Sequence, residues 1–299
     1  MADRAPTIDA ALVEQLVAAQ FPQWAGLAVR PVEFDGWDNR TFRLGDRLSV
    51  RLPSAPGYIP QVEKEHRWLP ALAPLLPLRI PEPIGLGRAS ASFPWPWSVY
   101  GWIDGQVADR APISDRIRFA ADLAAFLLAL SDIDPTDGPE PGEHNFFRGG
   151  PLEVYDDETR RAVSALGDRV DGRAALRVWD AALDATFTAP PVWFHGDVSA
   201  GNLLVRDGVL RAVIDFGTCG VGDPSCDLAI TWTMFDGGSR EVFRRSIARD
   251  SDTWARGRGW TLWKALIVAA GHAGTNSPGI GRSLRVIDDV IEDFTRFAE

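Results

Sequence analysis

Three side chains with oxygen donors follow one another inside a single short stretch, and no other part of the sequence is better suited to chemistry. The stretch Val192–Gly217 reads VWFHGDVSAGNLLVRDGVLRAVIDFG. Asn202 comes five positions after Asp197, and Asp215 comes thirteen positions after Asn202. A strand, a polar loop and a hairpin in this order can bring all three side chains into one small volume.

These residue types fit one kind of reaction. An amide oxygen and a carboxylate oxygen are hard ligands that suit Mg²⁺, which keeps water molecules and shares its shell with phosphate oxygens. A separate carboxylate can orient a hydroxyl and accept its proton. Phosphoryl transfer needs little beyond positioning and charge neutralisation. The stretch therefore predicts a phosphotransferase.

The sequence blocks around these residues resemble a known family. The blocks are His-Gly-Asp-x-x-x-x-Asn from His195 and Ile-Asp-Phe-Gly from Ile214, followed by Gly222-Asp223-Pro224 and Asp227-Leu228-Ala229. They are similar to the aminoglycoside phosphotransferase family of antibiotic and small-molecule kinases. The resemblance covers nearly the whole chain and is weakest before Gly105. It implies an α+β, protein-kinase-like fold with two lobes.

The resemblance also implies roles for five residues of the motif. Asp197 is expected to be the catalytic base or hydroxyl-orienting group, and Asn202 and Asp215 are expected to hold Mg²⁺. His195 and Asp227 are expected to support the catalytic loop by hydrogen bonds. A serine hydrolase is excluded, because Asp197 stands where the first glycine of a nucleophile elbow would be.

The expected nucleotide side is less regular. The turn Gly36-Trp37-Asp38-Asn39-Arg40 contains one glycine, so Gly36 and Asn39 are the candidates for cradling phosphate. The strand that carries the phosphate lysine in the family has Arg51 at that place, and an arginine can grip phosphate oxygens with two donors. We expect Glu65 to be its ion-pair partner, with Glu63 as second choice.

The strand Ser98–Gly105 resembles the hinge that joins the two lobes in the family. Backbone groups of Gly101 and Ile103 are then expected to pair with the edge of a purine. We expect the donor to be ATP or GTP. Tyr100 falls where the back wall of the purine pocket should be, and its bulky side chain favours GTP or the use of both nucleotides.

The resemblance implies that the acceptor is an aminoglycoside-like antibiotic, bound between the catalytic loop and the C-terminal helices. The negative balance of the chain mildly favours a cationic acceptor, for which carboxylates are needed. The candidates are Asp223, Asp236, Asp289 and Glu292. Four tryptophans lie in the same half and could hold sugar rings or cations, although Trp260 and Trp263, three positions apart, are more typical of core. A macrolide, a peptide antibiotic or a small metabolite alcohol is the alternative acceptor, and a catalytically silent nucleotide-binding scaffold is the alternative function.

The elements that must position these residues change character along the chain. Residues 1–103 form the expected nucleotide-binding lobe and residues 104–299 the expected catalytic and acceptor lobe. The first lobe is predicted to have helices at Ile8–Gln20 and Gln61–Leu72, a three-stranded antiparallel meander, and later short strands; the strands are Leu27–Phe34, Asn39–Leu44, Arg47–Leu52, Ile84–Leu86 and Trp97–Trp102.

The second lobe is predicted to be mainly helical. A hairpin of Leu203–Arg206 and Leu210–Ile214 turns at Asp207-Gly208, and a loop runs from Asp134 to Pro151. The predicted helices are Ile113–Leu130, Asp156–Phe187, Asp223–Phe235, Arg240–Asp250, Thr253–Ala273 and Ser283–Ala298.

Composition narrows the class of protein further. The 299 residues carry 41 acidic and 31 basic side chains, a net charge of −10 that argues against a nucleic-acid partner. No apolar stretch is long enough to cross a membrane, and the N-terminus lacks a signal peptide. Cys219 and Cys226 are expected to be buried in a reducing compartment, so we expect a cytoplasmic protein. We expect it to be a monomer or a homodimer. The only lysines are Lys64 and Lys264.

Overall fold

The computed structural model describes residues 7–32, 38–271 and 277–297. Its N-terminal part is built on one antiparallel sheet of five strands in the order β1-β2-β3-β5-β4. The strands are β1 (Val29–Pro31), β2 (Asn39–Leu44), β3 (Leu48–Pro53), β5 (Trp97–Gly101) and β4 (Pro83–Gly87). The predicted meander and both later strands are therefore confirmed, although β1 is shorter than predicted.

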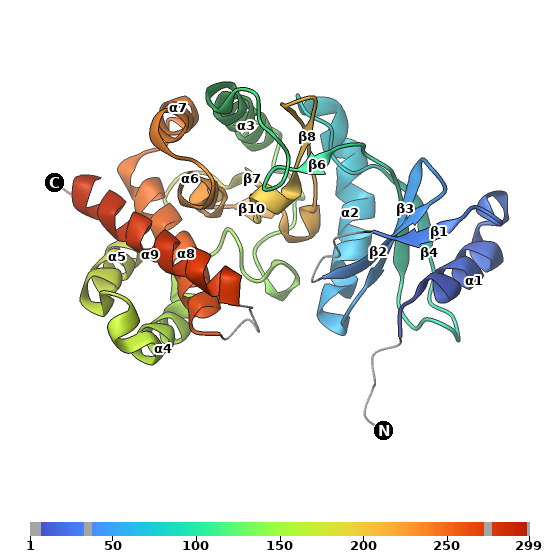
Figure 1. Cartoon of the computed structure of the whole chain (residues 1–299), viewed down its shortest axis with the longest axis horizontal. Helices are drawn as coiled ribbons and strands as arrows, with labels where there is room; N and C mark the ends of the chain where they lie inside the picture. Colours follow the sequence, from blue (N-terminus) through green and yellow to red (C-terminus); the bar gives the residue numbers. More distant parts are fainter. Residues whose placement is uncertain (1–6, 33–37, 272–276, 298–299) are drawn as a thin grey trace.

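Two helices flank this sheet. Helix α1 (Ala10–Gln20) begins where Asp9 accepts a hydrogen bond from the backbone N–H of Leu12, and it buries an apolar stripe against the sheet. Helix α2 (Ile59–Leu72) lies between the sheet and the rest of the molecule (Figure 1). Both predicted helices are present, and α2 is placed so that one of its faces reaches the second half of the chain.

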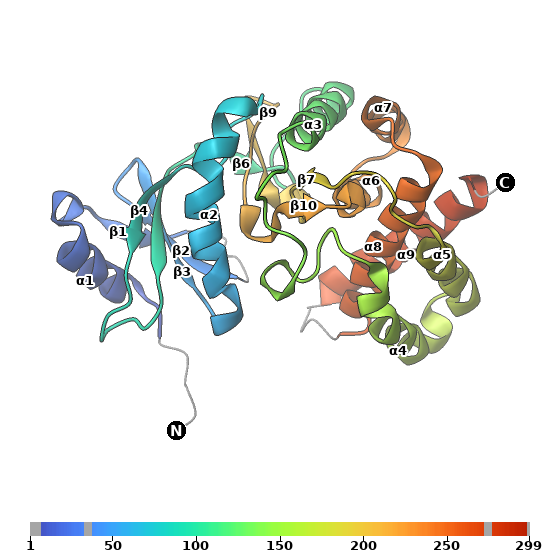
Figure 2. The ribbon, with the colours of Figure 1, turned by 180° about the vertical axis from the view of Figure 1, so that it is seen from behind.

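The second half is mainly helical, as predicted, and it also holds two small antiparallel sheets. One sheet has the order β6-β8-β9 and the other pairs β7 with β10 (Figures 1 and 2). These strands are β6 (Gln106–Val107), β8 (Leu203–Arg206), β9 (Val209–Val213), β7 (Val192–Phe194) and β10 (Gly220–Gly222), and the helices are α3 (Arg116–Ser131), α4 (Asp156–Leu166), α5 (Gly172–Asp184), α6 (Ile230–Thr233), α7 (Gly237–Ile247), α8 (Ser251–Ala269) and α9 (Ser277–Phe297).

The predicted single helix Asp156–Phe187 is wrong. The structure has two helices there, and the first ends at Leu166 because Gly167 adopts a left-handed backbone with φ of +53°. A short 3₁₀ turn follows, and Asp171 then caps α5 by accepting from the backbone N–H of Ala174. The predicted helix Asp223–Phe235 is likewise a 3₁₀ segment, Pro224–Ala229, followed by the four-residue α6.

The apolar core is divided into two clusters. The smaller cluster joins α1 to one face of the five-stranded sheet. The larger one fills the helical half and also includes Leu69 and Leu72 of α2 and Tyr100 of β5. Helix α2 is thus packed into the core of the half that holds the loop of Asp197. The division of the chain at Ile103 remains a prediction.

Buried side chains agree with several sequence expectations. Trp260 and Trp263 lie in the larger core, as do Trp232 and Trp254. Both cysteines are buried, and burial raises the pKa of the Cys219 thiol to about 11. Within the described ranges, no helix is long and apolar enough to cross a membrane.

Candidate active site

A hairpin and a short loop bring Asp197, Asn202 and Asp215 together. Strand β7 leads into the loop that carries Asp197, and the β8–β9 hairpin follows it. The hairpin turns as predicted, because Asp207 and Gly208 both have positive φ. The backbone N–H of Ile214 donates to the carbonyl oxygen of Asn202 at 2.9 Å, which places Asp215 directly beside the start of the hairpin.

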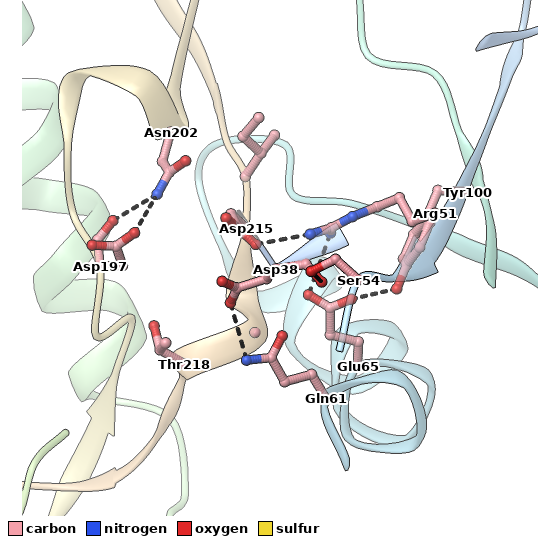
Figure 3. A network of polar contacts seen from close by, with 12 residues as sticks. Asp38, Arg51, Ser54, Gln61, Glu65, Tyr100, Asp197, Asn202, Asp215 and Thr218 are labelled. Carbon is pink, nitrogen blue, oxygen red and sulfur yellow. Dashed lines mark hydrogen bonds and ion pairs between the residues drawn. The ribbon is translucent and has the colours of Figure 1, made fainter. Parts of the chain in front are cut away.

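The amide of Asn202 is oriented by Asp197. Its Nδ2 donates to the backbone oxygen of Asp197 at 2.9 Å and to Asp197 Oδ2 at 3.0 Å. The Oδ1 atom of Asn202 then lies on the side that faces Asp215 (Figure 3). One oxygen of each carboxylate and the amide oxygen thus border a common space.

Asp215 is held by a cation from the other half of the chain. Its backbone is left-handed, with φ of +67°, an uncommon conformation for a residue other than glycine. Arg51 Nη2 on β3 donates to Asp215 Oδ1 at 2.9 Å, and Arg51 Nη1 lies 3.6 Å from Glu65 Oε1 on α2. Burial lowers the pKa of Arg51, but the charges of Glu65 and Asp215 more than offset it, so the pKa is raised. Arg51 therefore stays charged and links the two halves (Figure 3).

The two residues that are expected to support the loop of Asp197 both make hydrogen bonds within it. Asp227 accepts from the backbone N–H groups of His195 at 2.8 Å and Gly196 at 2.7 Å. Burial raises the pKa of Asp227, and the nearby His195 together with these two donors opposes the shift. The ring of His195 bridges Ile214 and Asp197, because its Nε2 lies 3.0 Å from the Ile214 oxygen and its Nδ1 accepts from the Asp197 N–H at 3.2 Å.

The hinge offers one free backbone donor. Gly101 already donates its N–H to the Glu82 oxygen at 2.9 Å, so only its carbonyl remains for a purine. Among the described residues, no backbone oxygen accepts a hydrogen bond from the N–H of Ile103. The hydroxyl of Tyr100 donates to Glu65 Oε2, and burial and Glu65 raise the Tyr100 pKa. Tyr100 is buried between the hinge and α2, at the expected back wall.

The expected phosphate turn is described only in part. Gly36 lies outside the described residues, and Asn39 is buried at the start of β2. Asp38, which sequence reasoning did not single out, accepts from Gln61 Nε2 at 3.2 Å (Figure 3). Burial and the charge of Asp215 raise the pKa of Asp38, and its carboxylate lies near Asp215 in Figure 3.

Three of the four acceptor candidates lie beside arginines. The prediction that Asp223 contacts the acceptor is wrong, because Asp223 is buried and its carboxylate binds Arg256 Nε at 2.6 Å. Asp289 lies 3.3 Å from Arg240 Nη2, and Asp236 precedes α7 with its carboxylate 3.8 Å from Arg116 Nη2. Glu292 is exposed on α9. The spacing of these acids in the sequence did not reveal the arginines that neutralise three of them.

One lysine and one arginine near the site were missed. Lys64 of α2 is buried and donates to the backbone oxygens of Gly217 at 2.6 Å and Cys219 at 2.9 Å, beyond Asp215. Arg148 Nε donates to the Gly196 oxygen at 3.1 Å. The scarcity of lysine in this arginine-rich chain was the one signal that could have drawn attention to Lys64.

The donor set fits Mg²⁺ completed by phosphate and water. Within the described residues no group of three or more His, Cys, Asp or Glu side chains could hold a metal ion alone. Asp215 keeps Oδ2 free of Arg51, and Asn202 keeps Oδ1 free of Asp197. One carboxylate and one amide oxygen are typical of a Mg²⁺ site whose remaining ligands come from substrate phosphates.

Comparisons with known proteins agree with this geometry. Aminoglycoside 3'-phosphotransferase of Escherichia coli is 35% identical over 108 residues, which is 36% of either chain, so this chain matches about a third of the length of that curated relative. The GDP and kanamycin complex of APH(2'')-IIia has a TM-score of 0.74 at 16% identity, over 94% of this chain and 98% of that one. Macrolide 2'-phosphotransferase MphH from Brachybacterium faecium has a TM-score of 0.59 at 21% identity, with the same coverage.

The solved structures confirm the expected two-part α+β fold, which is the fold of these phosphotransferases. The family assignment rests on the sequence itself. Residues 28–260 match the family model described as the phosphotransferase enzyme family, a match that spans more than half of the chain and includes the loop of Asp197, the hairpin and Asp215. Both lines of comparison confirm the resemblance found in the sequence motifs: the chain belongs to the phosphotransferase enzyme family.

Proposed function

We propose that this protein transfers the γ-phosphoryl group of ATP or GTP to a hydroxyl group of a small molecule. The observation that carries the proposal is the contact network in which Asn202 binds Asp197 while Asp215 binds Arg51. It joins a free carboxylate oxygen, two Mg²⁺-type ligands and a fixed cation in one place. The solved relatives bound to GDP or ADP support a nucleotide donor.

Each side chain has a distinct task in this reaction. Arg51, kept in place by Glu65, binds phosphate oxygens of the donor. Asn202 and Asp215 hold Mg²⁺, which neutralises charge on the phosphates when bound. Asp197 orients the acceptor hydroxyl through Oδ1 and accepts its proton as the new O–P bond forms and the bond to the leaving nucleoside diphosphate breaks. His195 and Asp227 keep the loop of Asp197 in register with Asp215.

The hinge supports a purine donor. The carbonyl of Gly101 and the free N–H of Ile103 supply one acceptor and one donor for the base. The buried Tyr100 limits the depth of the pocket, and we propose use of GTP or of both nucleotides. A hundredfold preference for ATP, measured as kcat/KM, would contradict this part of the proposal.

The acceptor class was first expected to be an aminoglycoside-like antibiotic. Solved relatives bound to kanamycin, gentamicin or streptomycin support an aminoglycoside acceptor. The macrolide phosphotransferases among the solved relatives support a macrolide acceptor instead. A macrolide, a peptide antibiotic and a small alcohol therefore remain alternative acceptors. The neutralised carboxylates of the helical half favour an acceptor that is not a polycation.

The test is a coupled assay of nucleotide consumption with Mg²⁺. It compares ATP with GTP over aminoglycosides, macrolides, tuberactinomycins, hydroxy acids and small alcohols. We expect acceptor-dependent consumption that Asp197→Asn abolishes, while Asp207→Asn in the exposed hairpin turn leaves it unchanged. Nucleotide binding without consumption for any acceptor would instead support the silent scaffold.

A further inference from the structure

Helix α2 carries three buried polar side chains on the face that meets the candidate site. Lys64 and Glu65 follow Gln61 by three and four positions, which places all three on one side of the helix. Gln61 contacts Asp38 and Glu65 contacts Arg51, so both serve the expected nucleotide side (Figure 3). Lys64 has a different set of partners, and it has no task in the reaction described above.

The ammonium group of Lys64 is enclosed by acceptors from the second half of the chain. Nζ donates to the backbone oxygen of Gly217 at 2.6 Å and to that of Cys219 at 2.9 Å. His144 Nδ1 lies 3.5 Å from Nζ, and Nε2 of the same ring donates to the Glu140 oxygen at 2.9 Å, which leaves Nδ1 as an acceptor. Lys64 is only 9% exposed, so its three donors meet three acceptors with little access for water.

The two backbone oxygens that Lys64 binds belong to the turn that follows Asp215. This turn is the 3₁₀ segment Phe216–Thr218, and Asp215 precedes it with a left-handed backbone, at φ of +67°. Such a backbone costs free energy at a residue other than glycine, so it persists only where the surrounding structure holds it. One acceptor of Lys64 lies inside the turn and the other is the residue directly after it, so Lys64 ties the turn to α2.

Helix α2 and this turn are in close contact. A Cβ atom built on Gly217 would lie 2.6 Å from Oε1 of Gln61, which is closer than such atoms approach in proteins. Gln61 is buried and bound to Asp38, so it cannot easily move aside. The main chain of Gly217 therefore lies directly against α2, where Lys64 can reach it, and this contact depends on the absence of a side chain at Gly217.

We propose that Lys64 is a positioning residue, which fixes the turn after Asp215 and thereby aims this carboxylate at Mg²⁺. The inference rests on the proposed function, in which Asn202 and Asp215 hold Mg²⁺. Lys64 acts through the backbone of the turn rather than by contact with the reacting groups. Groups that orient metal ligands set metal affinity, and their loss costs about 10–100-fold. A residue that only joined the two halves of the chain would change stability and leave Mg²⁺ binding unaltered.

The test separates metal binding from nucleotide binding. Calorimetry measures the Kd of the β,γ-imido analogues of ATP and GTP for the intact protein, once with Mg²⁺ and once with EDTA. We expect Lys64→Met to weaken binding at least about tenfold with Mg²⁺, as Asp215→Asn should. The Kd in EDTA should stay the same in Lys64→Met, because Arg51 and Glu65 are unchanged. Lys64→Arg keeps donors for both backbone oxygens and should restore most of the loss.

A control variant shows whether the effect follows from lost stability alone. Arg244→Met removes one of the two arginines on Asp293, which keeps Arg258 at 3.0 Å. It should lower the thermal midpoint and leave the Kd with Mg²⁺ unchanged. If Lys64→Met does not fold, Lys64→Gln, which is shorter and uncharged, takes its place and should also lose affinity only with Mg²⁺.

Three outcomes would overturn the inference and leave the proposed function standing. They are unchanged binding in Lys64→Met, equal weakening with Mg²⁺ and with EDTA, and a loss of the same size in Arg244→Met. The second would mean that Lys64 serves the nucleotide site as a whole, and the other two that its role is only structural. Failure of both analogues to bind the original protein would instead remove the proposed function together with this inference.

Discussion

The two sides of the candidate site treat positive charge in opposite ways. On the nucleotide side, Arg51 is in contact with two carboxylates, those of Glu65 and Asp215. On the other side of the loop of Asp197, Arg148 has no carboxylate within ion-pair distance among the residues that the structure describes; its Nε donates to the Gly196 oxygen, and its guanidinium lies beside the rings of Trp260 and Trp263. The protein therefore neutralises Arg51 with two carboxylates, and it holds Arg148 with a hydrogen bond and two aromatic rings.

This difference has an energetic meaning. Breaking a buried ion pair is expensive because it leaves the partner charge desolvated. Removing a cation that has no such partner leaves no buried charge unpaired, and only its hydrogen bond and its contacts with aromatic rings are lost. Substitutions on the two sides should therefore differ in stability even when both remove one arginine.

Asp197→Asn should have the largest effect, and it tests whether the loop between the two sides is the reacting centre. We expect kcat to fall about a thousandfold, in the range typical of lost general-base catalysis. The thermal midpoint should stay close to that of the unchanged protein, because the asparagine can keep the contact to Asn202. Asp207→Asn is the control, and a kcat reduced less than about tenfold would contradict the assignment.

Arg51→Met should have the next largest effect, because it leaves Glu65 and Asp215 facing each other without a cation. We expect a loss of about 3 kcal/mol in the free energy of unfolding and a rise in the KM for the nucleotide. Urea denaturation and steady-state kinetics measure the two effects. Arg51→Lys should recover most of the stability; if the methionine variant were as stable as the original protein, the ion-pair account of the nucleotide side would fail.

Arg148→Met makes the comparison directly. It removes a buried arginine of similar accessibility but leaves no carboxylate unpaired. We expect a loss of only about 1–2 kcal/mol, for the hydrogen bond to Gly196 and the contacts with the two tryptophans. The same urea experiment applies. A loss equal to that of Arg51→Met would mean that Arg148 has an anionic partner in the protein after all.

Asp38→Asn should have the smallest effect and depends on pH. Because burial and Asp215 raise the folded-state pKa of Asp38, its ionised carboxylate costs stability at neutral pH. That cost is relieved as pH falls through the raised pKa towards the unfolded value of 3.8. The variant should therefore be more stable at pH 7, by less than about 1 kcal/mol, and its advantage should shrink towards pH 4. Asp46→Asn, in an exposed turn, should show no such trend in its thermal midpoint.

The motif residues were predictable because they are close in sequence. Asp197, Asn202 and Asp215 lie on one loop and one hairpin, so their spacing almost fixes their distances. The pairing of Arg51 with Glu65 was also predicted, since both belong to a known strand–helix arrangement. Helix boundaries were less predictable, and the single glycine at 167 split what periodicity presented as one long helix.

The sequence by itself indicated the proposed reaction centre, and it determined the sheet, the hairpin and the membership of a phosphotransferase family, because each depends on neighbours within a few dozen residues. Only the tertiary structure decided which charges remain available. Asp223 and Asp289 are acids in the sequence but bind arginines from other helices. Arg148 lies in a loop far from both Gly196 and α8 in the sequence, and packing against Trp260 and Trp263 holds it beside Gly196. Charge compensation depends on contacts between distant segments, so composition and spacing cannot specify it.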